Sequence, residues 1–152
     1  MLGLDTNVLI RFLVADDLVQ FERAQRLIRR ESSNSEPVFI SLVVLLETEW
    51  VLRSRYRLKK FEISATLAGL LESNELRIED ESSVEEALFL WNDSSAEFAD
   101  CLIGARYRAL GCRATATFDA KALRLPGFVA ARALPFVGGC LRHMAQSPRL
   151  IR

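Results

Sequence analysis

The sequence predicts one α/β domain with a mainly parallel sheet, on two observations. Short apolar runs alternate with helical patterns along the chain, which is typical of strand–helix–strand units. The chain has 152 residues, of which half are hydrophobic, and this is enough for one sizeable core. No apolar run approaches the roughly 20 residues that span a membrane. The N-terminus lacks a signal pattern and the cysteines form no CxxC pair, so we expect a cytoplasmic protein with free thiols.

Apolar spacing and breaking residues place the individual elements. We expect strands at Leu2–Leu4, Val38–Ile40, Leu76–Glu79 and Ala114–Thr117, with a fifth at Ala133–Val137. We expect the first four helices at Asn7–Val14, at Leu18–Ile28 behind a capping Asp16 or Asp17, at Leu42–Arg53 and at Lys59–Glu72.

Two capping boxes predict the last two helices. Ser82 with Glu85 opens one, and Ser94 with Glu97 opens another that Gly111 ends. The domain is expected to cover residues 1–137, and residues 138–152 form a basic tail that we expect to be loosely ordered.

The formal net charge is zero, but the charges are unevenly distributed. Residues 101–152 contain nine of the 20 Lys and Arg residues and only one acid, Asp119. This basic end could supply phosphate-binding cations beside an acidic site, or it could be an accident of surface charge.

Four carboxylates need an explanation. Asp5 and Asp119 follow predicted strands, and the carboxyl ends of parallel strands meet at one rim of a sheet. Glu47 and Asp100 lie on apolar helices with no cation at the neighbouring helical positions, whereas Glu49 has Arg53 four residues on. Each acid also has an ordinary interpretation. Asp5 could cap a helix, and Asp119 could cap the turn after its strand. Glu47 could reach solvent or pair with a core arginine, and Asp100 could be an acid in the first turn of its helix.

Together the four acids indicate a metal site. Two like charges 4 Å apart repel by about 4 kcal/mol at an effective dielectric constant near 20, and a divalent cation removes that penalty. Magnesium and manganese prefer oxygen ligands, and the single histidine, His143, gives no reason to expect zinc.

The chain resembles the PIN-domain nucleases, specifically the toxins of VapBC-type (type II) toxin–antitoxin systems, over about residues 1–137. The segments that carry the resemblance are Leu4–Ile10, Leu46-Glu47, Phe98–Asp100, and Ala116–Asp119 followed by Pro126-Gly127.

The resemblance implies a three-layer α/β/α domain with a central parallel sheet of about five strands. It implies that Asp5, Glu47, Asp100 and Asp119 bind Mg²⁺, with Mn²⁺ as an alternative, and hydrolyse RNA through an activated water. Asn7 and Thr117 match polar positions that support such a site. The resemblance further implies a homodimer and a cognate antitoxin, and the basic tail is either an extension or a contact for RNA or antitoxin.

Two other functions remain open. The chain could be a non-catalytic PIN-like subunit that binds nucleic acid with its antitoxin partner. A phosphatase of the haloacid-dehalogenase type would also have an acid after the first strand, but it needs a second aspartate two residues on, where this chain has Asn7.

Overall fold

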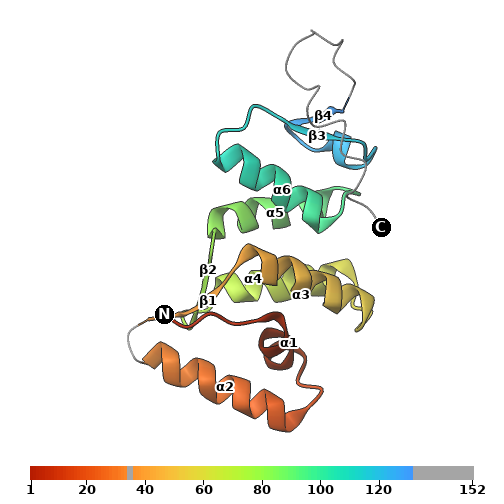
Figure 1. The fold of residues 1–152 in the computed structure, drawn as a ribbon. Coiled ribbons are helices and arrows are strands. Elements are labelled where there is room, and N and C mark those ends of the chain that lie inside the picture. The colour runs from red at the N-terminus through yellow and green to blue at the C-terminus, as the bar shows by residue number, and fades with distance from the viewer. Residues whose placement is uncertain (34–35, 132–152) are drawn as a thin grey trace, which may run out of the picture.

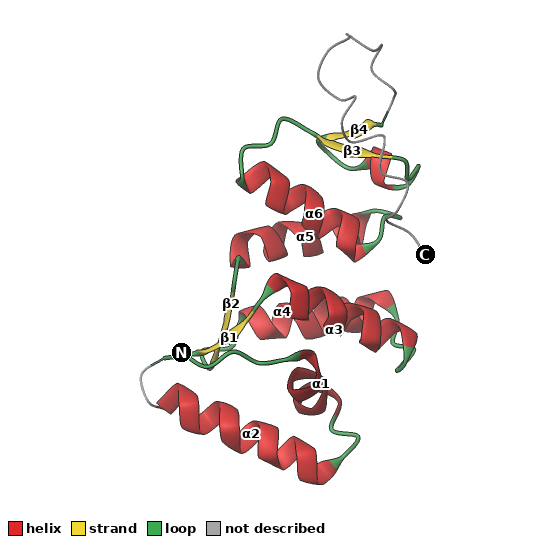
Figure 2. Cartoon of the chain, in the orientation of Figure 1, coloured by secondary structure: helices red, strands yellow, loops and turns green. Residues whose placement is uncertain are grey.

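The computed structural model describes residues 1–33 and 36–131, and within them it confirms a mixed α/β fold (Figures 1 and 2). The predicted strand at 133–137 and the tail at 138–152 lie outside the described residues. In chain order the elements are α1 (Thr6–Val14), α2 (Leu18–Ser33), β1 (Val38–Ile40), α3 (Leu42–Ser54), α4 (Lys60–Leu71), β2 (Leu76–Ile78), α5 (Glu81–Asp93), α6 (Phe98–Ala109), β3 (Thr115–Thr117), a 3-10 turn η1 (Ala122–Arg124) and β4 (Phe128–Ala130).

All the strand pairs are parallel, but they do not form one five-stranded sheet within the described residues. β1 pairs with β2, and the first predicted strand is reduced to a single parallel bridge between Gly3 and Phe39. β3 pairs with β4 in a second, separate sheet. Each strand has only three residues, so each ladder has few hydrogen bonds and the helices supply most of the packing.

The predicted helices are present, with ends that differ by a few residues. Two predicted capping boxes are wrong. Asp80, not Ser82, caps α5 by accepting from the backbone N–H of Ser83, and no side-chain hydrogen bond caps α6, which begins at Phe98. The Ser94 hydroxyl instead accepts from the backbone N–H of Ala96 before the helix starts.

The core lies between the helices and the short strands. Helices α5 and α6 pack closely, with the rings of Trp91 and Phe98 centred 5.2 Å apart, and α4 lies against α5 (Figure 1). Cys101 is buried and Cys112 exposed, and both are free thiols. Within residues 1–33 and 36–131, no helix is both long and apolar enough to cross a membrane.

Candidate active site

Asp5 caps the N-terminus of α1, directly after the segment that bridges to β1. Its Oδ1 accepts a 2.8 Å hydrogen bond from the backbone N–H of Val8. The backbone N–H of Leu4 donates to the carbonyl of Phe39 at 2.9 Å, which holds the preceding segment beside β1. The second carboxylate oxygen of Asp5 makes no hydrogen bond with the described residues, and the side chain is exposed. Capping therefore leaves part of this carboxylate available to a ligand.

Glu47 lies on an exposed face of α3, not on the buried face that the sequence predicted. The buried face of α3 is formed by Leu45, Thr48, Glu49 and Leu52. Glu47 also has a partner that the sequence did not predict, because the hydroxyl of the buried Thr6 donates to its Oε2 at 2.5 Å. This hydrogen bond joins α1 to α3, and its donor, Thr6, is the residue that directly follows Asp5.

The buried acid on α3 is Glu49, and it is paired as predicted. Arg53 Nε donates to Glu49 Oε1 at 2.8 Å, and the Glu49 residue is only 3% exposed. Arg53 also lies 3.9 Å from Glu97 at the start of α6.

Asp100 and Asp119 form a second acidic pair. Asp100 lies in the first turn of α6 and is partly buried. Burial raises the pKa of Asp100, and the nearby negative charge of Asp119 raises it further. Asp119 is exposed, and its pKa is lowered because the backbone N–H groups of Ala122 and Lys121 donate to its Oδ1 at 3.0 and 2.6 Å.

The predicted acids thus fall into two groups: Glu47 is hydrogen-bonded to Thr6, the residue after Asp5, and Asp119 lies near enough to Asp100 for its charge to raise the pKa of Asp100. Among the described residues, no three His, Cys, Asp or Glu side chains lie close enough to share one metal ion. The convergence of all four acids on one site stays a prediction.

The two supporting residues lie one in each group. The Thr117 hydroxyl accepts a 3.0 Å hydrogen bond from the backbone N–H of Asp119 and so helps to fix the turn that carries this acid. Asn7 is exposed and lines a pocket next to Glu47.

That pocket lies between α1 and α3 and has a volume of about 410 Å³. We call it the α1–α3 pocket. It combines a carboxylate with two cations and two aromatic rings, a chemistry that suits a nucleotide. The residues that line this pocket include Thr6, Asn7, Arg11, Glu47, Trp50, Arg55 and Tyr56.

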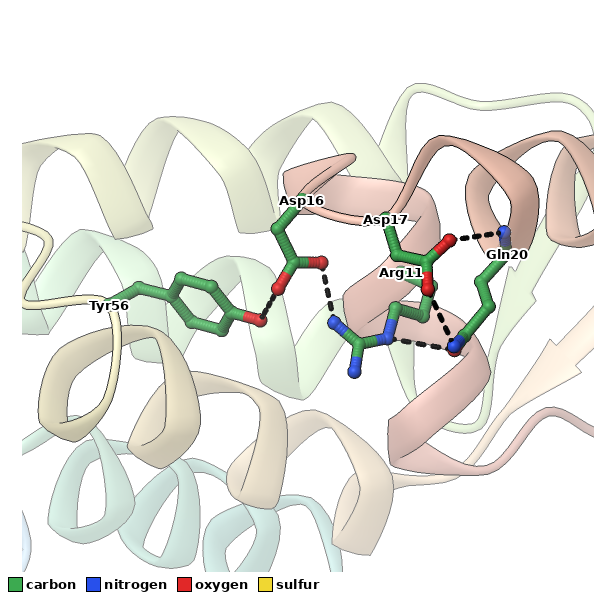
Figure 3. A network of polar contacts seen from close by, with 5 residues as sticks. All are labelled: Arg11, Asp16, Asp17, Gln20 and Tyr56. Atoms are coloured by element: carbon green, nitrogen blue, oxygen red, sulfur yellow. Dashed lines mark hydrogen bonds and ion pairs between the residues drawn. The ribbon is translucent and has the colours of Figure 1, made fainter.

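A polar network holds Arg11 at the edge of this pocket (Figure 3). Arg11 Nη1 donates to Asp16 at 2.5 Å, Arg11 Nε donates to Gln20 at 3.0 Å, and the Tyr56 hydroxyl donates to Asp16 at 2.7 Å. The two donors lower the pKa of Asp16, and its charge in turn raises the pKa values of Arg11 and Tyr56. The network fixes the loop between α1 and α2 against the chain after α3.

Sequence reasoning missed Thr6 and Tyr56 as parts of this region. Thr6 lies between Asp5 and Asn7 in the motif at the start of the chain, and this position could have identified Thr6 as part of the site. Nothing in the spacing of Tyr56 pointed to Asp16, 40 positions earlier.

The donor atoms fit a hard divalent cation. All four predicted ligands are carboxylates, and Mg²⁺ is commonly held by one or two carboxylates together with waters and substrate phosphates. Burial and the nearby charge of Asp119 both disfavour the ionised Asp100 side chain, so a cation bound there would offset an unfavourable negative charge.

Short parallel strands between helices, with acids at the ends of strands and helices, define an α/β protein with an acidic surface site. The chain belongs to the PIN domain family, whose model matches residues 3–127. PIN domains are generally nucleases that use divalent metal ions, so membership indicates a nuclease-type function. Comparison with curated proteins found no relative that matches the chain.

Proposed function

We propose that this protein is a Mg²⁺-dependent endoribonuclease and the toxin of a VapBC-type toxin–antitoxin pair. The observation that supports the proposal is that, in a chain of the PIN domain family, the charge of Asp119 acts on the partly buried Asp100. The resemblance to VapBC-type toxins further implies that Asp5 and Glu47 belong to the same site. A polar site of this kind is costly unless a cation neutralises it.

In this proposal each group of acids has a defined task. Asp100 and Asp119 hold the divalent ion, and Asp5 and Glu47 complete its surroundings through water. When bound, the ion lowers the pKa of a water and neutralises charge on the phosphodiester. Thr6 fixes the carboxylate of Glu47, and Thr117 fixes the turn of Asp119, so that these oxygens are oriented before RNA binds.

The proposed partners are RNA, a cognate antitoxin and a second copy of the chain. Support for the two protein partners is the resemblance to VapBC-type toxins, together with large apolar side chains on the surface. Val43, Phe61 and Phe89 are each more than 60% exposed.

The test is cleavage of a labelled single-stranded RNA by the full chain, in Mg²⁺ and in EDTA. We expect cleavage only with Mg²⁺, and we expect Asp5→Asn and Asp100→Asn to reduce the rate by at least about 100-fold with an unchanged circular dichroism spectrum. Asp93→Asn is the matched control, because Asp93 is an exposed acid at the end of α5, outside both groups. Full activity of Asp5→Asn in Mg²⁺ would exclude its assigned role.

One observation favours a second candidate, a PIN-like subunit that binds nucleic acid without cutting it. No group of three candidate ligands forms within residues 1–33 and 36–131. RNA binding without any cleavage, in Mg²⁺ or in Mn²⁺, would select this function.

A further inference from the structure

We propose that one face of α2, carrying Arg23, Arg26 and Arg30, binds the phosphate backbone of single-stranded RNA and leads it to the α1–α3 pocket. We call this face the α2 track. The substrate class rests on the proposed ribonuclease function, but the binding surface is argued from its own geometry.

The first observation is continuity between three hollows in the surface. The α1–α3 pocket shares Asn7 and Arg11 with a hollow of about 220 Å³ between α1 and α2. This second hollow shares Arg23 and Leu27 with a third, of about 400 Å³, on α2. The three hollows are therefore neighbours along the surface from Glu47 to Arg30 in the last part of α2, which lies alongside α1 in Figure 1.

The second observation is the charge on this path. Arg23, Arg26 and Arg30 have the spacing of one helical face and cover about 10 Å of α2 at roughly 1.5 Å per residue. Among the described residues, Arg26 and Arg30 have one ion pair each, at 3.6 Å with Glu22 and at 2.7 Å with Glu31, and both arginine side chains are exposed. Arg26 Nε also donates to the carbonyl of Glu22 at 3.2 Å. Exposed pairs of this type contribute little, so phosphates can replace the carboxylates at small cost.

Arg23 is the most available of these cations. Its side chain is exposed and makes no hydrogen bond or ion pair with any described residue. It also borders both the second and the third hollow. A phosphate bound there would lie between the hollow that adjoins the α1–α3 pocket and the hollow that Arg30 lines.

Arg11 stands at the junction between the pocket and the track. Its Nη1 and Nε are held by Asp16 and Gln20, as Figure 3 shows, and its Nη2 has no hydrogen-bond partner among the described residues. A guanidinium fixed in this way loses little conformational entropy when it binds a phosphate. The track therefore begins with a preorganised cation and continues with exposed ones.

An RNA strand explains this arrangement better than an acidic protein segment. The track starts at the pocket that Glu47 lines, and Glu47 is one of the four acids of the proposed nuclease site. An RNA strand carries one negative charge at every nucleotide along such a path. Continuous negative charge matches cations repeated along one helix face.

The test compares Arg23→Glu with Arg29→Glu in the full chain carrying Asp5→Asn, which prevents cleavage. Both arginines are exposed on α2 and both substitutions change the charge equally, but Arg29 borders none of the three hollows. Binding of a fluorescein-labelled single-stranded oligouridine is measured by anisotropy in EDTA over a series of KCl concentrations.

We expect Arg23→Glu to weaken binding roughly tenfold and to reduce the slope of log affinity against log salt by about 0.7, the value for one phosphate contact on a single strand. Arg29→Glu should change affinity by less than about twofold, through screened long-range charge alone. Circular dichroism spectra of the two variants should be the same. Equal losses in both variants, or no loss in either, would overturn the α2 track.

The result separates the two proposals. If Arg23→Glu weakens RNA binding and the chain without Asp5→Asn does not cut RNA in Mg²⁺, the track stands and the nuclease proposal fails. If the chain cuts RNA and Arg23→Glu binds normally, the track fails alone, and an acidic protein partner becomes the occupant to examine.

Discussion

The hydroxyl of Thr6 donates a 2.5 Å hydrogen bond to Oε2 of Glu47, although 41 positions separate the two residues. The donor is buried and the acceptor is exposed, so the core of the domain orients a carboxylate at its surface. Glu47 has no other hydrogen bond to a described side chain, and this contact therefore decides where its carboxylate points.

Removal of this hydroxyl should reduce activity without unfolding the protein. Thr6→Val keeps the shape of the side chain and loses the donor, and changes of this type around metal ligands typically reduce metal affinity or activity by about 10–100-fold. Thr6→Ser keeps the donor and should retain most activity. Mg²⁺ titrations of RNA cleavage measure the effect, and equal activity of the two variants would contradict it.

Asp100→Asn should make the metal-free protein more stable while it abolishes activity. Burial and the charge of Asp119 both disfavour the ionised Asp100 side chain, so its neutral analogue should raise the free energy of unfolding by about 1 kcal/mol. Urea unfolding in EDTA measures whether the free energy of unfolding rises or falls. A loss of stability would show that Asp100 and Asp119 do not repel each other in the folded protein.

The Glu49–Arg53 pair should show strong coupling. Arg53→Met leaves the buried Glu49 carboxylate without its partner and should cost about 2 kcal/mol, less than for a fully buried pair because Arg53 is half-exposed. The double variant Glu49→Gln/Arg53→Met removes both charges and should be less damaging than the sum of the single changes. A double-mutant cycle by urea unfolding measures this, and strict additivity would rule the coupling out.

Stability should depend on Asp80 at acidic pH. The Ser83 hydroxyl donates to Asp80 at 2.7 Å and lowers the pKa of Asp80 below its ordinary value of 3.8, with Ser82 and the Arg106 guanidinium adding to the effect. A lowered folded-state pKa stabilises the protein above the unfolded-state value, and this contribution is lost as the pH falls through the folded-state value.

Asp80→Asn should therefore cost about 1–2 kcal/mol at neutral pH, and the difference from the wild type should shrink below about pH 4. Urea unfolding at several pH values measures it, with Asp93→Asn as the control. A difference that stays constant down to pH 2 would contradict the linkage to Asp80.

Substitution by alanine should have opposite effects on stability at two glycines in helices. A Cβ at Gly104 would lie 2.5 Å from a ring carbon of Phe128, so Gly104→Ala should displace β4 from α6 and cost about 1–2 kcal/mol. Gly69 in α4 has nothing within 4 Å of its Cβ position, so Gly69→Ala should stabilise the helix by about 0.5–1 kcal/mol. Thermal unfolding compares them, and similar midpoints for the two variants would contradict the prediction.

The sequence predicted the helices well because apolar spacing and breaking residues are local signals. It failed where a competing residue lay nearby, since Asp80 outcompetes Ser82 as the cap of α5. β4 was not predicted at Phe128–Ala130 because three half-exposed residues after Gly127 give no periodic pattern.

The candidate site was only partly predictable for a similar reason. Spacing identified the acids, but the side of α3 that faces the core depends on tertiary packing, and this buries Glu49 while Glu47 stays at the surface. The Thr6–Glu47 contact and the Tyr56–Asp16 contact join distant segments, and a single sequence carries no signal for either.

The exposure of Asp5, Glu47 and Asp119 bears on whether the chain folds before or after it binds a metal ion. Charges that remain hydrated add little to the cost of chain collapse, so the polypeptide can reach its native shape before it captures any ion. For the proposed metal-dependent nuclease, a chelator should therefore remove activity reversibly without unfolding the protein.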